Sequence, residues 1–262
     1  MKFKKLFAGL VALPVIVAGC SCAKDGEYVE VDKMEAFTYI NEVKSDNNFN
    51  MEGYNYVMEI SVPDFTNEDS LSFITMTTEG AFAIGENGVE ATLELSSSGI
   101  EDAATGEIYI KGNTIYINDG ETKKYATIPV GEEDLYSFFY DGTSGEYNAI
   151  PSFEAQILAT LEQIENSEDV DAYVMTKRKE GTTTYKLESE LEEEGEGFSF
   201  GGIEIEVELT FKDDKLINAS YSMDFAIMKV NISFSKLNEA ISFPSFDEYQ
   251  EDLSILDEYY VA

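Results

Sequence analysis

Apolar and polar residues repeat along this chain with two different periods. Between residues 32 and 45, Met34, Phe37, Ile40 and Val43 recur every third residue, which predicts an amphipathic helix. Asp32 stands directly before this segment and is a residue type that caps helix N-termini. From residue 54 onward the period becomes two, as expected of strands with one buried and one solvated face.

Strands with this alternation are predicted in two regions. The first comprises residues 54–62, 71–78, 89–96, 107–111, 114–118 and 123–128, and the second comprises 173–179, 182–191, 203–211, 217–225 and 228–234. Tight turns are predicted between neighbouring strands at the pairs Gly112-Asn113, Asp119-Gly120, Glu180-Gly181 and Asp213-Asp214. Consecutive strands are therefore expected to be antiparallel.

Three further helices are expected outside the strands. Acidic residues begin the segment 132–139, which favours a helix whose positive end carries them. Ser152 is the expected N-cap of a second helix, whose apolar face consists of Phe153, Ile157, Leu158, Leu161 and Ile164. A closing helix is predicted from the spacing of Phe246, Tyr249, Leu253 and Leu256. The stretch 188–202, rich in glutamate and glycine, is expected to be a solvated loop or a hairpin tip.

One domain accounts for this order of elements, because no long polar linker separates the two β regions. The predicted fold class is α+β: a strongly curved antiparallel β-sheet, a half-barrel, with helices covering the concave face. A sheet of about ten strands tends to curl, and helices that bury their apolar stripes on it satisfy both hydrophobic periods.

The net charge of the 262-residue chain is −35, from 17 basic and 52 acidic residues. Three of the lysines lie within the first five residues, so a chain without its leader would carry 14 basic residues against the same 52 acidic ones, a net charge of −38. Such a surface repels phosphate backbones, which excludes nucleic acid as a partner. It also means that no basic face can hold the whole protein at a membrane.

Histidine is absent, so the chain cannot form a Ser-His-Asp or Cys-His catalytic arrangement or a histidine metal site. The acidic clusters 213–214, 192–194 and 132–134 do not match the spacing of a calcium loop. Paired carboxylates can hydrolyse glycosides, but no pair here stands in a recognisable catalytic frame. We therefore expect a protein that is not an enzyme and that has no metal and no cofactor.

The first twenty residues indicate export and lipidation. Three lysines precede the uncharged apolar run Leu6–Val17, which is too short to span a bilayer comfortably and is interrupted by Pro14. The sequence Val17-Ala18-Gly19-Cys20 resembles the lipobox of bacterial lipoproteins. This resemblance implies cleavage before Cys20 and diacylation of its thiol. The alternative is an ordinary secreted protein with a cysteine there by chance.

These inferences divide the chain into three parts: a lipoprotein signal peptide at 1–19, a lipidated tether at 20–31, and a single domain at 32–262. The expected location is the cell envelope, at the outer face of the cytoplasmic membrane, through the N-terminal lipid anchor. Cys22 is the only other cysteine and is expected to be a simple thiol of the tether, so no intrachain disulfide is predicted.

The segment 107–117, with Lys124-Tyr125 after it, and the late hairpin Leu209–Met223 resemble the envelope lipoprotein carriers with an open half-barrel, of the LolA, LolB and LppX/LprG type. The resemblance concerns the order of elements from about residue 32 to 250. It implies non-catalytic binding of a lipid or other hydrophobic ligand inside the half-barrel.

Apolar side chains on the predicted inner faces are the candidate ligand-binding residues: Tyr54, Tyr56, Met58, Ile60, Leu93, Val207, Leu209, Tyr221, Met223 and Phe225. Methionine and tyrosine suit an irregular aliphatic ligand with a polar end. The alternative is an ordinary core in which these side chains interdigitate and leave no space. In that case the chain would act as an acidic interaction or sensor module at the cell surface, with a protein partner and no small ligand.

Overall fold

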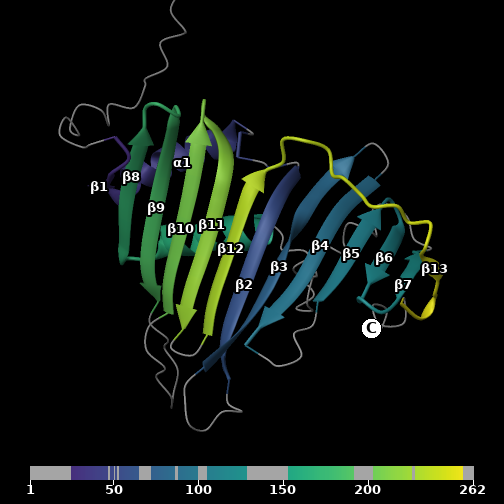
Figure 1. The fold of residues 1–262 in the computed structure, drawn as a ribbon. Helices are drawn as coiled ribbons and strands as arrows, with labels where there is room; N and C mark the ends of the chain where they lie inside the picture. Colours follow the sequence, from purple (N-terminus) through teal and green to yellow (C-terminus); the bar gives the residue numbers. More distant parts are fainter. Residues whose placement is uncertain are drawn as a thin grey trace, which may run out of the picture.

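The computed structural model describes residues 25–46, 48–49, 51, 53–64, 72–85, 88–99, 105–128, 153–191, 203–225 and 228–255. Within these residues, thirteen strands form one sheet (Figure 1). The strands are β1 (Tyr28–Val31), β2 (Gly53–Asp64), β3 (Ser72–Gly85), β4 (Gly88–Ser98), β5 (Thr105–Lys111), β6 (Thr114–Asn118), β7 (Lys123–Thr127), β8 (Val170–Lys177), β9 (Thr182–Leu191), β10 (Ile203–Lys212), β11 (Lys215–Phe225), β12 (Met228–Lys236) and β13 (Gln250–Glu251). The helical elements are α1 (Lys33–Ser45), η2 (Glu154–Leu158) and α3 (Ala159–Asn166).

The strand order is β1-β8-β9-β10-β11-β12-β2-β3-β4-β5-β6-β7-β13, and every neighbouring pair is antiparallel except β7 and β13. The two predicted β regions meet where β12 pairs with β2, for example Ile232 with Met58 and Phe234 with Tyr56. The sheet is curved and does not close, since β1 and β13 are opposite edges (Figure 1). A single curved sheet is therefore confirmed, with more strands than predicted.

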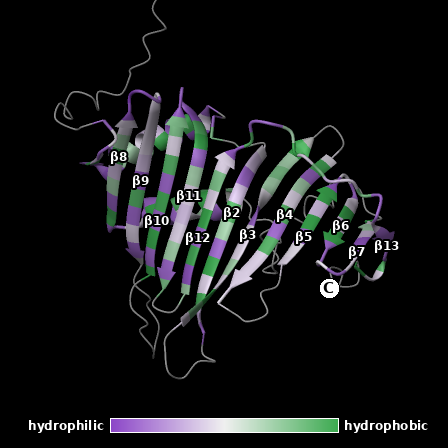
Figure 2. Cartoon of the chain, in the orientation of Figure 1, coloured by the Kyte–Doolittle hydropathy of each residue, from purple (hydrophilic) through white to green (hydrophobic). Residues whose placement is uncertain are grey.

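Hydrophobic and hydrophilic residues alternate along many of the strands (Figure 2). Because successive residues of a strand point to opposite faces of a sheet, this alternation gives the sheet two chemically different faces. We call the face that carries Tyr54, Val207 and Tyr221 the inner face, and the face that carries the intervening, mostly polar residues the outer face. Strand β10 illustrates the pattern: Ile205, Val207 and Leu209 are buried, whereas Glu204 is exposed. The predicted period of two is confirmed in this strand.

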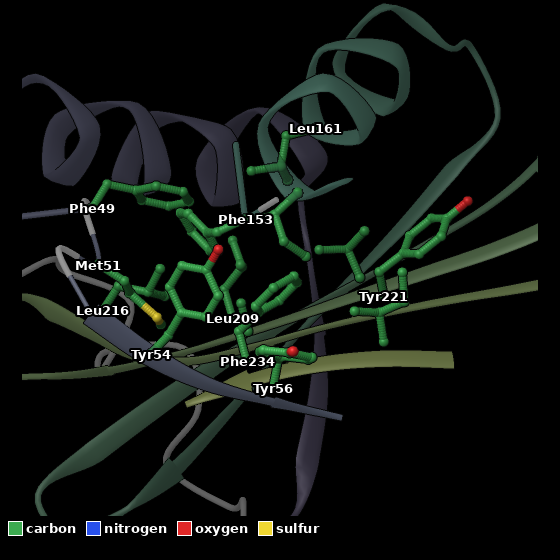
Figure 3. Packing of buried hydrophobic residues seen from close by; sticks show 14 of the residues in the cluster. Phe49, Met51, Tyr54, Tyr56, Phe153, Leu161, Leu209, Leu216, Tyr221 and Phe234 are labelled. Atoms are coloured by element: carbon green, nitrogen blue, oxygen red, sulfur yellow. The ribbon is translucent and has the colours of Figure 1, made fainter. Parts of the chain in front are cut away.

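Helix α1 begins as predicted, with the Asp32 side chain accepting a hydrogen bond from the Met34 backbone N–H. Its buried face joins the sheet through Ala36, Phe37, Ile40 and Val43. The second helical segment buries the predicted residues Phe153, Ile157, Leu161 and Ile164, while Leu158 is half-buried. These two segments belong to the same buried cluster as the inner face of β8–β12 and β2 (Figure 3).

The predicted helical cover over the whole concave face is not confirmed. The described helices are short and contact the β8–β12 half of the sheet, and Met76 on the inner face of β3 remains 46% exposed. The described part of the chain is therefore mostly sheet, with a partial helical layer.

The predicted closing helix is wrong for residues 246–253, and its last residue, Leu256, lies outside the described residues. Residues 237–249 run without regular structure to the two-residue strand β13, and among the described residues that follow it only Ser254 and Ile255 have helical geometry. Phe246 instead stacks on Tyr116 of the outer face, with ring centroids 3.7 Å apart, and contacts Tyr249 edge-on. Aromatic stacking on the sheet and backbone pairing with β7 therefore outweigh the helical spacing.

The tether is shorter than predicted, because residues 28–31 form β1 and pair with β8. The short polar segment gave no periodic signal, and the pairing depends on a strand that lies far along the chain. The predicted helix at 132–139, the Ser152 cap, the acidic stretch 192–202 and both cysteines lie outside the described residues.

Replacing Asp32 with Ala should remove the N-terminal cap of α1 and lower the free energy of unfolding by about 1 kcal/mol. Thermal unfolding of the variant measures this loss. Asp32→Ser keeps an acceptor for the Met34 N–H and should stay close to the parent, so equal losses in both variants would contradict the capping role.

Candidate functional site

The inner face has a tightly packed part that contains most of the predicted ligand-binding residues. Six of the ten candidates are buried in the core: Tyr54, Tyr56, Leu93, Val207, Leu209 and Tyr221. The Tyr54 ring stacks on Phe82 at 5.3 Å between centroids and meets Phe234 edge-on at the same distance. The ring of Phe153, in the helical layer, meets the Phe234 ring edge-on, with 5.6 Å between the centroids (Figure 3). These side chains act as core packing between sheet and helices.

A second part of the inner face is open. The other four candidates, Met58, Ile60, Met223 and Phe225, are only half-buried. Further apolar side chains lie beside them in register, since Ile60 pairs with both Met76 and Val230, and Thr78 separates Met58 from Leu95. We call these residues the open strip: Met58, Ile60, Met76, Leu95, Met223, Phe225 and Val230.

The open strip offers a surface for aliphatic groups. Met76 and Leu95 are 46% and 40% exposed, and none of the seven residues carries a charge. Three of them are methionines, whose unbranched side chains adapt to irregular apolar shapes. The strip runs across five neighbouring strands, β11-β12-β2-β3-β4, so it is continuous rather than a set of isolated side chains.

Tyr221 marks the boundary between the packed core and the open strip. Its ring is buried, and its hydroxyl lies 3.0 Å from the Met223 sulfur as a hydrogen-bond donor. In Figure 3 this hydroxyl points away from the other labelled side chains. Burial raises the pKa of Tyr221, so the phenol is neutral at physiological pH and offers a polar but uncharged contact.

On the opposite, mostly polar face of the sheet, the described residues line three pockets. The largest is about 780 Å³ and lies over β8–β11, and two others of about 390 and 330 Å³ flank β2. The largest pocket is lined by eight carboxylates: Glu168, Asp169, Asp171, Glu188, Glu190, Glu204, Glu206 and Asp224. Like charges face each other across the strands there, as in the pairs Glu188–Glu206 and Glu190–Glu204. This arrangement disfavours any anionic ligand.

Lys186 sits among these carboxylates on the outer face. Its Nζ atom lies 2.6 Å from Glu188 Oε1 and 3.7 Å from Glu206 Oε2. The same Nζ lies 5.3 and 5.1 Å from the ring centroids of Tyr28 and Tyr173, within cation–π range. Partial burial raises the pKa of Glu206 despite the nearby lysine. Lys186 therefore offsets part of the repulsion and ties β1, β8, β9 and β10 together.

No group of three or more potential metal-ligating residues is arranged to hold an ion within the part of the chain that the structure describes. Asp213 and Asp214 form the β10–β11 hairpin turn with positive φ angles of 50° and 56°, and Asp214 accepts a hydrogen bond from Tyr39. The acidic clusters 132–134 and 192–194 fall outside the described residues. Among the described helices, none has both the length and the apolar composition needed to cross a bilayer.

Met76, Leu95 and Val230 belong to the open strip but were not among the candidate ligand-binding residues predicted from the sequence. Each lies in a predicted strand, and the alternation assigns Leu95 and Val230 to apolar faces. The exposure of these side chains depends on how far the helical layer extends over the sheet. The alternation of apolar and polar residues along a strand does not predict this extent. The register of β3 against β2 then brings Met76 beside Ile60.

Comparisons with known proteins give only weak similarities. No family model matches the chain, and no curated protein matches it. Solved structures to which the chain is weakly similar include LprF from Mycobacterium bovis, at 12% identity and a TM-score of 0.43, covering 81% of this chain and 97% of that one. A DUF1329 family protein from Desulfovibrio piger ATCC 29098 has 10% identity and a TM-score of 0.24, covering 81% and 96%. The YwiB protein from Bacillus subtilis has 10% identity and a TM-score of 0.17, covering 74% and 99%.

Proposed function

We propose that this protein is a lipid-anchored envelope protein that binds a lipid or another hydrophobic molecule without catalysis. The anchor is the diacylated Cys20, and the ligand lies on the open strip of the inner face. The observation that carries the proposal is the continuity of seven uncharged apolar side chains across five strands, of which Met76 and Leu95 are 46% and 40% exposed.

Physical chemistry favours an apolar ligand over a polar one at this strip. Exposed apolar surface contributes roughly 25 cal/mol for each Å² that a ligand removes from water. The strip carries no acid, base or nucleophile that could act on a bound molecule. Tyr221 at its edge supplies a neutral hydroxyl that can meet the polar end of an amphiphile.

The first test measures binding of Nile red, a neutral dye that the acidic surface does not repel. We expect saturable binding to the parent protein and at least tenfold weaker binding to Met76→Glu, because a buried carboxylate against an apolar ligand costs more than 1.4 kcal/mol. Fluorescence titration at neutral pH gives both affinities.

Phe73→Glu is the matched control. Phe73 is 49% exposed on the same strand as Met76 but points to the outer face, so its replacement should leave dye binding unchanged. Absence of dye binding by the folded parent protein, or equal weakening in both variants, would contradict binding on the inner face.

A second candidate function is an acidic interaction module that captures a basic protein partner. The pocket of about 780 Å³ on β8–β11, with its eight carboxylates, favours this alternative. It predicts salt-sensitive binding of a basic partner that Glu204→Gln and Glu206→Gln weaken together, with no effect of Met76→Glu.

A further inference from the structure

The last described part of the chain lies as a strap against strands β5–β7. Residues 237–249 lead without regular structure from the end of β12 to β13, which pairs in parallel with β7 (Figure 1). At the start of this segment the Leu237 N–H donates to the Gly53 carbonyl at 3.0 Å. We call residues 243–252 the strap and residues 238–242 its connection to the sheet.

Aromatic rings of the strap cover part of the outer face of β5–β7. The Phe246 ring is stacked on the Tyr116 ring, with 3.7 Å between the centroids and 10° between the planes. Tyr249, which is 9% exposed, meets the same ring edge-on at 5.5 Å. The Phe243 ring centroid lies 5.3 Å from Lys111 Nζ, within cation–π range. The strap therefore shields the Tyr116 ring from water.

Opposite charges match the strap to β7. Lys123 Nζ lies 2.7 Å from Glu248 Oε2, and this pairing lowers the pKa of Glu248, so the carboxylate is ionised at neutral pH. Lys124 Nζ lies 2.9 Å from Asp252 Oδ2. Both lysines thus meet strap acids, in a chain with 52 acidic and only 17 basic residues. The edge at β7 is therefore complementary to an extended segment that carries acids and aromatic rings, as the strap does.

The strap also closes the backbone edge that β7 would otherwise present. In β13, Gln250 pairs with Lys124 of β7. The Asp252 N–H donates to the Tyr125 carbonyl at 2.9 Å. An open edge strand carries unpaired N–H and carbonyl groups and readily pairs with another chain. Because β13 has only two residues and the ion pairs lie at the surface, we expect the strap to open at a lower free energy than the whole fold.

The connection between β12 and the strap has little slack. Nine residue steps separate Leu237 from Phe246, and an extended chain covers at most about 3.6 Å per residue, so the reach is roughly 32 Å. Five strand spacings of about 4.8 Å separate β12 from β6, which carries Tyr116, so the crossing takes roughly 24 Å. Short connections with little slack favour exchange of the connected element between copies of a protein.

We propose that the strap is an exchangeable latch, which closes β7 in a single chain and binds β7 of a second copy in a dimer. The aromatic rings and acids that fit β7 belong to the strap itself, so they fit β7 of either copy equally well. Reciprocal exchange satisfies both edges in a closed two-fold dimer. The net negative charges of two copies repel, but screening limits this repulsion to roughly 8 to 10 Å at physiological salt. The inference is independent of the proposed hydrophobic ligand.

Disulfide formation between two single-cysteine chains tests the exchange. Both chains carry Cys20→Ser and Cys22→Ser. One chain has Gln250→Cys in β13, and the other has Lys124→Cys, its register partner in β7. After the two are mixed at high concentration and oxidised, we expect a disulfide-linked heterodimer. Its yield should be at least tenfold higher than when Asn218→Cys, at an exposed position of β11, replaces Lys124→Cys.

Matched variants identify the contacts responsible. A chain with both Gln250→Cys and Lys124→Cys should close the disulfide within one molecule and then stay monomeric. Adding Phe246→Ala to the Gln250→Cys chain should lower the heterodimer yield at least tenfold, because the strap loses its stacked ring. Adding Leu253→Ala instead, at a position that is 58% exposed, should leave the yield unchanged.

Equal heterodimer yields from the two cysteine pairs, or an unchanged yield with Phe246→Ala, would overturn the exchange. So would monomers alone in the mixture when the double-cysteine chain closes readily. A double-cysteine chain that does not close within one molecule would overturn the latch itself.

Discussion

Replacing Gly80 with Ala should destabilise the fold by about 3 kcal/mol, because strands β3 and β4 approach each other too closely there for a side chain. A Cβ atom at Gly80 would lie 1.8 Å from the Thr92 carbonyl oxygen and 2.9 Å from the Tyr56 hydroxyl oxygen. The Tyr56 hydroxyl donates to the same Thr92 oxygen at 3.1 Å. The substitution therefore separates the strands and breaks this buried hydrogen bond. Urea unfolding gives the loss directly.

Gly106→Ala provides the control for this prediction. Gly106 lies in strand β5, and a Cβ atom there would be 3.7 Å from the Asn118 carbonyl oxygen, an ordinary contact. Its replacement should change stability by less than about 1 kcal/mol, since it adds a methyl group without a clash. Comparable losses at Gly80 and Gly106 would show that the close approach of β3 and β4 does not limit stability.

The second large effect is expected for Phe234→Ala, with a loss of about 3 to 5 kcal/mol. Phe234 is 2% exposed and contacts Tyr54 from the sheet and Phe153 from the helical layer. Removing its ring leaves a cavity at the point where the two β regions and the helices meet. The parent and the variant are compared by urea unfolding monitored through tyrosine fluorescence.

Phe73→Ala removes the same ring from a position that is 49% exposed, and we expect a loss below about 1 kcal/mol. If Phe234→Ala were as mild as Phe73→Ala, the aromatic cluster would not be the stabilising core of the fold. If both substitutions caused large losses of stability, the difference in burial between the two positions would not determine the size of the loss.

Local sequence patterns predicted the elements of the fold better than their assembly. The Asp32 cap, the apolar stripe of α1 and the hairpin at Asp213-Asp214 follow from residues near one another in the chain, and the structure contains all three. Strand β1 and strand β13 were missed because each pairs with a distant strand and is short or polar. Alternation gives the face of a residue but not the identity of its neighbouring strand.

The candidate site could be predicted only in part for the same reason. Alternation placed Tyr54, Tyr56, Met58 and Ile60 on one face, and the structure agrees. It could not separate the buried Tyr54 and Tyr56 from the half-exposed Met58 and Ile60, because that division depends on where the helices end above the sheet. The register of β2 against β3 then adds Met76 to the open strip.

Native mass spectrometry of the protein purified from its own membranes tests binding on the open strip most directly. The account predicts a population of folded protein carrying a noncovalent apolar molecule, which dissociates on activation and is reduced at least tenfold in Met76→Glu but not in Phe73→Glu. A folded parent protein that carries only its covalent acyl chains, and that also fails to bind Nile red, would contradict the account.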